Sequence, residues 1–172
     1  MASRDEVVAY IGIGSNLGNR REHFRRAAQQ LDSHPLCQVR RVSPYYQSVA
    51  IGPGEQADYL NAVIELSTSL CSDQLLDVLL LIETRHERTR EVRWGPRTLD
   101  LDLLLFADER QHSDRLQLPH PRIAERNFVV YPLFDLAPTL VLPDGMPLAT
   151  IRSKLDSQGL CKLADEEETV RA

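Results

Sequence analysis

The segment from 99 to 106, with the sequence LDLDLLLF, constrains the fold most, because it places two aspartates inside a run of apolar residues. Residues two apart in a β-strand point to the same side of the sheet. The alternation therefore predicts a strand that carries Asp100, Asp102 and Leu104 on one face. We expect the opposite face to pack against helices through Leu99, Leu101, Leu103 and Leu105.

Three earlier segments have the composition of strands, and two amphipathic segments between the strands have the spacing of helices. Asn19, with Glu22 three residues later, is typical of a helix N-cap, and Ser72 is the expected cap of a second, leucine-rich helix. The order β-α-β-β-α-β predicts an α+β fold with a ferredoxin-like core. We expect a short C-terminal helical and strand extension, with a helix over 127–136. The expected strands cover 7–13, 39–48 with an interruption at Pro44, 59–66 and 99–106.

The chain has 172 residues, which is enough for one domain with a hydrophobic core. We expect a single domain over residues 1–160 and an acidic, flexible tail over 161–172. The net charge of −5 argues against a surface built to neutralise a nucleic-acid backbone. We therefore expect small-molecule substrates rather than nucleic acid. We also expect a monomer, although the sequence itself carries no signal for the oligomeric state.

The three cysteines, Cys37, Cys71 and Cys161, are widely spaced and include no Cys-x-x-Cys pair. A disulfide framework or a zinc site is therefore not expected, and reduced thiols fit a cytoplasmic protein. The acidic start of the chain lacks the basic and then apolar residues of a signal peptide. The longest aliphatic patch, 75–82, is too short to cross a bilayer, and we expect no membrane role.

Carboxylates two residues apart on one strand face can bind a common cation, and hard oxygen ligands favour Mg²⁺. Acids on an exposed strand face are also common without any ligand, and nearby arginines can form ordinary surface salt bridges. The surroundings of Asp100 and Asp102 favour the metal, because arginines beside Mg²⁺ are what phosphate transfer requires. These arginines are Arg88, Arg90, Arg93 and Arg97.

Three glycines lie in the sequence GIGSNLG, from Gly12 to Gly18, before the first expected helix. The third glycine is one residue late for the dinucleotide-binding pattern G-x-G-x-x-G, and the chain has no G-x-x-x-x-G-K-[ST] phosphate loop. We interpret the stretch as a tight turn from strand to helix rather than as a ligand contact. His120, between two prolines and near Arg122 and Arg126, fits a surface residue and a phosphate contact equally well.

The run from 93 to 104, RWGPRTLDLDLL, resembles the signature of the hydroxymethyldihydropterin pyrophosphokinase family of folate biosynthesis. That signature has a basic residue, then Gly-Pro-Arg, then two acids separated by one apolar residue, and every position is satisfied. The similarity extends to YIGIGSNLGN, DYLNAVIEL, LPHPR and ERNFVVYPLFDLAP. It covers about residues 7 to 145.

The resemblance implies a ferredoxin-like fold and a reaction that transfers pyrophosphate from ATP to the hydroxymethyl oxygen of a reduced pterin, with release of AMP. Two Mg²⁺ ions would be held by Asp100 and Asp102, which would be catalytic together with Arg88 and Arg97. The resemblance implies an ATP site made of Arg88, Trp94, Arg97, His120 and Arg126.

The resemblance also implies a pterin site. On periodicity alone Tyr59 and Phe128 fit ordinary core aromatics, but in this family they would stack on the two faces of the pterin ring. Asn61 would bind the polar edge of the ring, since its amide both donates and accepts hydrogen bonds. The full set for the pterin is Ser48, Val49, Ile51, Tyr59, Asn61, Trp94 and Phe128.

Two other classes of protein share this order of elements. An RNA recognition motif needs the aromatic pattern [KR]-G-[FY]-[GA]-F-V-x-[FY] on its central strands, and no such run occurs in the sequence. A regulatory ligand-binding domain without catalysis would have no use for paired acids beside four arginines. The sequence therefore favours a Mg²⁺-dependent pyrophosphokinase over both alternatives.

Overall fold

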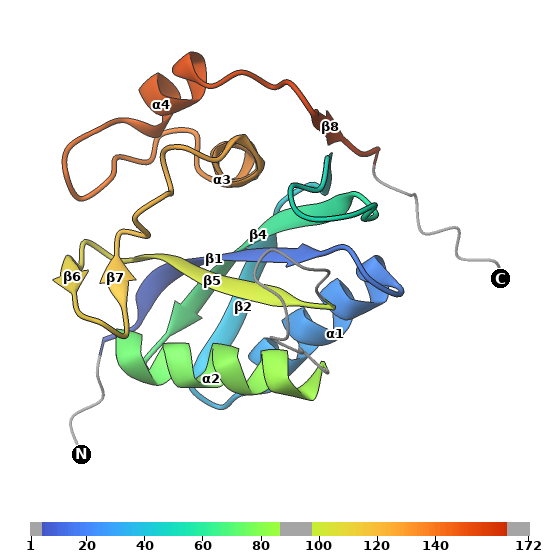
Figure 1. Ribbon diagram of the computed structural model, residues 1–172. Helices are drawn as coiled ribbons and strands as arrows, with labels where there is room; N and C mark the ends of the chain where they lie inside the picture. The colour runs from blue at the N-terminus through green and yellow to red at the C-terminus, as the bar shows by residue number, and fades with distance from the viewer. Residues whose placement is uncertain (1–4, 87–97, 165–172) are drawn as a thin grey trace, which may run out of the picture.

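The computed structural model of the chain describes residues 5–86 and 98–164. Within these residues a six-stranded sheet, in which every strand pair is antiparallel, separates two pairs of helices (Figure 1). The strand order is β5-β1-β4, after which β2 and β3 both pair along β4 and β8 pairs with β3.

The first part of the chain forms the sheet and the helices on one of its faces. Its elements are β1 (Val7–Ser15), α1 (Arg20–Asp32), β2 (Cys37–Val42), β3 (Tyr46–Ser48), β4 (Tyr59–Thr68), α2 (Ser72–Arg85) and β5 (Asp100–Phe106). The second part forms a small hairpin, the helices of the opposite face and the last strand. Its elements are β6 (Gln111–His112), β7 (Gln117–Leu118), α3 (Asn127–Leu136), α4 (Leu148–Lys154) and β8 (Leu160–Lys162).

The hydrophobic core has two layers, one on each face of the sheet. One layer packs α1 and α2 against the sheet through residues such as Phe24, Leu31 and Leu79. The other packs α3 and α4 against the opposite face through residues such as Val130 and Leu148. The central strand β4 is buried along almost its whole length, because both layers cover it.

Strand β5 contains a β-bulge that changes which leucines face which layer. Ile11 pairs with Leu103 and Tyr10 pairs with Leu105, so Leu104 is an extra residue in the ladder. Leu99, Leu101 and Leu103 face α1 and α2 as predicted. Leu105 instead joins Leu104 in the layer with α3. Phe106 packs in the layer with α1 and α2, where Leu105 was expected. The prediction for Leu105 was wrong because an inserted residue shifts the period-2 pattern.

Other boundaries differ from the expected ones by small amounts. Asn19 caps α1 as predicted, with its Oδ1 accepting a hydrogen bond of 3.1 Å from the backbone N–H of Glu22. The N-cap of α2 is Cys71, one residue before the predicted Ser72. The extended segment expected over 39–48, with its interruption at Pro44, forms β2 and β3 on either side of that proline. The helix over 127–136 is confirmed.

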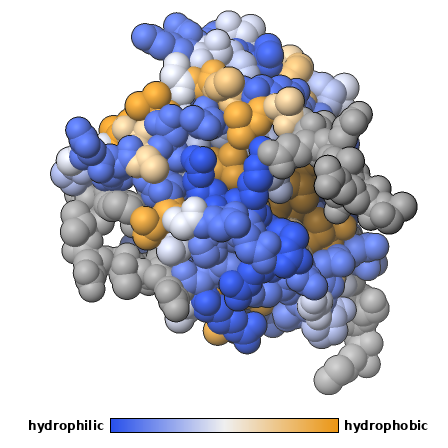
Figure 2. All heavy atoms as spheres, turned by 90° about the vertical axis from the view of Figure 1, so that its right-hand side faces the viewer, coloured by the Kyte–Doolittle hydropathy of each residue, from blue (hydrophilic) through white to orange (hydrophobic). Residues whose placement is uncertain are grey.

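The C-terminal extension includes the helical and strand elements that the sequence predicted. Strand β8 carries the chain two residues past the expected domain boundary at 160, and the rest of the expected tail from 165 onward lies outside the described residues. Within residues 5–86 and 98–164, every helix is too short or too polar to span a lipid bilayer. The face drawn in Figure 2 shows hydrophobic patches set among hydrophilic side chains.

Candidate active site

A cleft of about 830 Å³ opens on the face of the sheet that carries α3. Its floor is formed by β1, β4 and β5. Its walls come from the segment after β3, the start of α3, and residues 155–159 before β8. This volume is within the range of sites for small molecules, roughly 300–1,000 Å³.

One row of the sheet joins the two ends of the floor. Gly14 on β1 pairs with Asp100 on β5 and with Asn61 on β4. Residues opposite each other in an antiparallel pair point to the same face, so Asp100 and Asn61 face the cleft on either side of a glycine. A Cβ on Gly14 would lie 3.6 Å from Asn61 Oδ1. The lack of a side chain therefore keeps the floor open between the acid and the amide.

Gly12 on β1 pairs with Asp102 on β5, as Gly14 pairs with Asp100. Both Gly12 and Gly14 belong to β1 and line the cleft. The strand expected over 7–13 thus continues two residues further, and the interpretation of Gly14 as part of a tight turn was wrong. The turn into α1 is made by Gly18, whose φ of 68° favours glycine. The signal in the sequence is two glycines two residues apart inside a strand, which places both on one face.

The acid end of the cleft brings the carboxylates of Asp100 and Asp102 close to the guanidinium of Arg126. Asp100 and Asp102 both line the cleft. Arg126 Nη1 lies 3.8 Å from Asp102 Oδ2, and the Asp102 side chain remains 37% exposed. In the described part of the chain, no cluster of three or more His, Cys, Asp or Glu side chains is arranged to hold a metal ion. A pair of carboxylates in an open cleft still fits Mg²⁺, which takes few protein ligands and completes its shell with water and phosphate oxygens.

His120 is held beside the acid end by its backbone. Its N–H donates to the carbonyl oxygen of Leu104 on β5 at 2.9 Å, and its Nδ1 accepts from the backbone N–H of Arg122 at 3.1 Å. Burial, with smaller contributions from Arg126 and Arg122, lowers the pKa of His120 to about 4. The imidazole is therefore neutral at pH 7, with its proton on Nε2 available to donate a hydrogen bond.

The opposite end of the cleft is built around a buried amide. Asn61 is 5% exposed. Its Nδ2 donates to Ser48 Oγ at 2.8 Å and to the carbonyl oxygen of Tyr46 at 3.4 Å, both on β3. These bonds fix the amide plane and direct Oδ1 towards the floor at Gly14.

Aromatic and aliphatic side chains also line the cleft. Tyr59 begins β4 and Phe128 is the second residue of α3, and both line the cleft. The guanidinium of Arg126 lies 5.7 Å from the centre of the Phe128 ring. Val49 and Ile51, on the rim, are 62% and 81% exposed. Large apolar side chains with this exposure are available to a ligand that enters the cleft.

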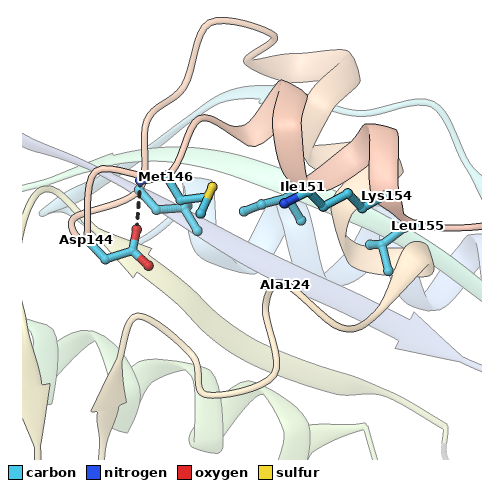
Figure 3. A pocket seen from close by; sticks show the side chains of 7 residues that line it. Ala124, Asp144, Met146, Ile151, Lys154 and Leu155 are labelled. Carbon is cyan, nitrogen blue, oxygen red and sulfur yellow. Dashed lines mark hydrogen bonds between the residues drawn. The ribbon is translucent and has the colours of Figure 1, made fainter.

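A second hollow of about 220 Å³ lies beside α4 (Figure 3). Most of its lining is aliphatic, and the carboxylate of Asp144 accepts a hydrogen bond from the backbone N–H of Met146 at 2.9 Å. Leu155 lines both this hollow and the main cleft. The hollow has little more than a quarter of the volume of the main cleft, so the main cleft is the candidate active site.

Comparison with known families decides the identity of the chain. The family model described as 7,8-dihydro-6-hydroxymethylpterin-pyrophosphokinase matches residues 10–138. This chain belongs to the hydroxymethyldihydropterin pyrophosphokinase family.

Relatives within the pyrophosphokinase family are similar over most of their length. The 2-amino-4-hydroxy-6-hydroxymethyldihydropteridine pyrophosphokinase of Pseudomonas aeruginosa is 42% identical over 154 residues, which cover 90% of this chain and 95% of that protein. The protein of the same name from Bacillus subtilis is 45% identical over 75% of this chain and 77% of its own length.

A crystal structure of wild-type Plasmodium falciparum HPPK-DHPS, solved with pterin and p-hydroxybenzoate, has the same fold. The TM-score is 0.69 at 12% sequence identity. The match covers 90% of this chain and 44% of that longer chain.

The structure places most of the residues that the pyrophosphokinase resemblance implied in this one cleft. Asp100, Asp102, Arg126, Ser48, Val49, Ile51, Tyr59, Asn61 and Phe128 all line it. His120 lies beside it, tied to β5. Arg88, Trp94 and Arg97, with Arg90 and Arg93, lie outside the described residues.

Sequence reasoning missed several parts of the cleft. Gly12 and Gly14 form its floor, and Asn127, Asp156 and Gln158 contribute to its walls. The sequence did mark the two glycines, because they are two residues apart in one strand. No local pattern marks the segment 155–159, because only the pairing of β8 with β3 brings it to the cleft.

Proposed function

We propose that this cleft is the active site in which the chain transfers pyrophosphate from ATP to the hydroxymethyl group of hydroxymethyldihydropterin, with release of AMP. The reaction belongs to folate biosynthesis. The observation that carries the proposal is the row through Gly14. In one cleft of a pyrophosphokinase-family chain, this row places Asp100, a ligand for the Mg²⁺ that accompanies the nucleotide, and Asn61, a partner for the polar edge of a pterin.

Asp100 and Asp102 would hold Mg²⁺, in two ions, at the acid end of the cleft. When bound there, Mg²⁺ supplies positive charge to the phosphate oxygens of ATP. Arg126 lies 3.8 Å from Asp102 and adds a further positive charge at the same end. His120, neutral at pH 7, would donate to a phosphate oxygen through Nε2 without adding charge. The proposal also includes phosphate binding by Arg88 and Arg97, with Trp94 at the ATP and pterin sites.

Asn61 would orient the pterin by its polar edge. Ser48 holds the Asn61 amide so that one oxygen acceptor faces the cleft, and a pterin edge that offers N–H groups matches such an acceptor. Tyr59 and Phe128 would stack on the ring, and Val49 and Ile51 would cover it from the rim. These contacts aim the hydroxymethyl oxygen at the acid end. Positioning and charge stabilisation then suffice for a loose phosphoryl-type transition state.

The proposal extends to the core architecture, the oligomeric state and the cellular location of the protein. The strand order β5-β1-β4-β2, with α1 and α2 on one face, supports a ferredoxin-like core extended by α3, α4 and β8. We propose a monomer formed by one domain. The cytoplasmic location stays a prediction, which the three free thiols support.

One assay tests the proposed function. The protein is incubated with ATP, Mg²⁺ and hydroxymethyldihydropterin, and AMP and the pterin diphosphate are measured by chromatography. We expect AMP to form in a one-to-one ratio with the pterin diphosphate, and to be absent when the pterin is omitted or Mg²⁺ is chelated. Binding of both ligands without AMP formation would instead indicate a regulatory ligand-binding module.

A further inference from the structure

The segment 155–159 between α4 and β8 forms a wall at the pterin end of the cleft, although it lies 49 or more residues along the chain from the strands of the floor. Leu155, Asp156, Gln158 and Gly159 all line the cleft. Leu155 also lines the hollow beside α4, so the segment separates two cavities. A thin wall of this kind keeps its position only if the surrounding elements hold its backbone.

Asn127 holds the segment from the side of α3. Its Nδ2 donates to the carbonyl oxygens of Asp156 at 2.9 Å and Gln158 at 3.3 Å. The Asp156 carboxylate in turn accepts from the backbone N–H of Gln158 at 2.8 Å, which closes a local turn. One side chain therefore satisfies two backbone acceptors of an exposed segment that lies outside any helix or strand.

The opposite side of the segment is joined to the rim of the cleft. The carbonyl oxygen of Gly159 accepts from the backbone N–H of Val49 at 3.2 Å, and β8 pairs with β3 directly afterwards. Asn127 immediately precedes Phe128, and Val49 immediately follows Ser48. The segment thus connects the two sides of the proposed pterin site, through the Asn127 side chain on one side and a main-chain hydrogen bond to Val49 on the other.

We infer that Asn127 is a positioning residue for pterin binding, which acts by holding the segment 155–159 between Phe128 and Val49. Without its two hydrogen bonds, the wall would separate from the start of α3 and the pterin end would widen. The acid end, built on β5, would keep its shape. This inference rests on the proposed function, and it assigns to Asn127 a role in substrate affinity rather than in the transfer step.

The test compares three variants in steady-state assays. Asn127→Ala removes the amide, and Asn127→Asp keeps its size but cannot donate to the two carbonyl oxygens. Tyr131→Phe is the matched control, because it removes the hydrogen bond of 3.0 Å from the Tyr131 hydroxyl to the Leu155 carbonyl oxygen at the far end of the same segment.

We expect both Asn127 variants to raise the KM for the pterin about tenfold, the loss expected from two modest hydrogen bonds. The KM for ATP and kcat should stay within about twofold, and Tyr131→Phe should change the pterin KM by less than about twofold. A variant that is merely less stable lowers the amount of active enzyme and hence kcat, and leaves the pterin KM unchanged.

Hydrogen exchange in the unaltered protein gives a second measurement that does not depend on how the variants fold. Pterin with a non-reactive ATP analogue should slow exchange of the backbone amides in 156–159. An unchanged pterin KM in Asn127→Ala, or exchange in this segment that does not respond to the ligands, would overturn the inference. An unaltered protein that forms no AMP would contradict the proposed function itself.

Discussion

The two ends of the cleft are built in different ways. The acid end takes both carboxylates from one strand, where Asp100 and Asp102 share a face because they are two residues apart. The pterin end takes its residues from β3, β4, the start of α3 and the segment before β8. A site on one strand follows from a local pattern, whereas a site made of four segments exists only when the whole sheet is assembled.

This difference predicts how substitutions at each end will act. Changes at the acid end should lower turnover and leave the fold intact, since the side chains of Asp100 and Asp102 are partly exposed and contribute little packing. Changes at the pterin end should alter substrate affinity, and changes to Asn61 or Ser48 should also cost some stability, since these two side chains are buried and hydrogen-bonded between β4 and β3.

The largest effect is expected for Asp102→Asn, which keeps the shape of the side chain and removes its charge. Turnover should fall on the order of 1,000-fold or more, because a neutral amide is a poor ligand for Mg²⁺. AMP release measures the loss. Thermal unfolding should be close to that of the unaltered protein. Asp108→Asn, on an exposed residue just after β5, is the matched control and should be fully active. Normal turnover in Asp102→Asn would remove the metal assignment.

Gly14→Val should affect both ends at once, because Gly14 lies between Asp100 and Asn61. A branched side chain there would occupy the floor of the cleft. We expect turnover to fall about 100-fold, the loss typical of a misplaced substrate. The turnover of Gly14→Ala should fall less, since a Cβ at this position would lie 3.6 Å from Asn61 Oδ1, an ordinary contact distance. Equal activity in the two variants would show that ligands do not cross this row.

Asn61→Ala should act on the pterin end alone. The KM for the pterin should rise about tenfold, because the polar edge loses its partner, while the KM for ATP stays the same. The free energy of unfolding should fall by about 1–2 kcal/mol, since the bond to Ser48 is buried. Gln47→Ala, which removes a neighbouring amide bonded to Asp58, is the control. A parallel rise in both KM values would contradict the division of the cleft.

The smallest effect concerns His120 and pH. Burial lowers its pKa to about 4 in the folded protein, against an ordinary value of 6.5. The unfolded chain therefore binds more protons than the folded protein between these values, and stability falls as the pH falls from 6.5 towards 4. Between pH 7 and pH 5 the free energy of unfolding of His120→Gln should fall by about 1 kcal/mol less than that of the unaltered protein, after allowance for the partial exposure of the imidazole. Urea unfolding at the two pH values measures the difference.

Much of the fold follows from local patterns. The cap at Asn19, the helix over 127–136 and the alternation of β5 up to Leu103 depend on neighbouring residues alone, and the structure agrees with them. The reversal at Leu105 was not predictable, because the bulge depends on how β1 pairs with β5. The interruption of the segment over 39–48 was predictable, because Pro44 marks it in the sequence, and β2 and β3 lie on either side of that proline.

The same distinction holds for the candidate site. Asp100 and Asp102 could be proposed as metal ligands from spacing and composition. Asn61, Tyr59 and Phe128 looked like ordinary strand and core residues, and only resemblance to a family separated them from the rest. The wall at 155–159 had neither a pattern nor a resemblance to mark it, since its place depends on contacts between residues more than 100 positions apart, such as Val49 and Gly159.

The row through Gly14 has a consequence for how loops in this protein can change in length. Neighbouring strands lie about 4.8 Å apart, so the backbones of Asp100 and Asn61 are held about 10 Å from each other across β1. Insertions or deletions in the connecting loops leave this separation unaltered. On the proposed function, main-chain geometry would therefore set the distance between nucleotide and acceptor, and surface segments would be free to diverge around it.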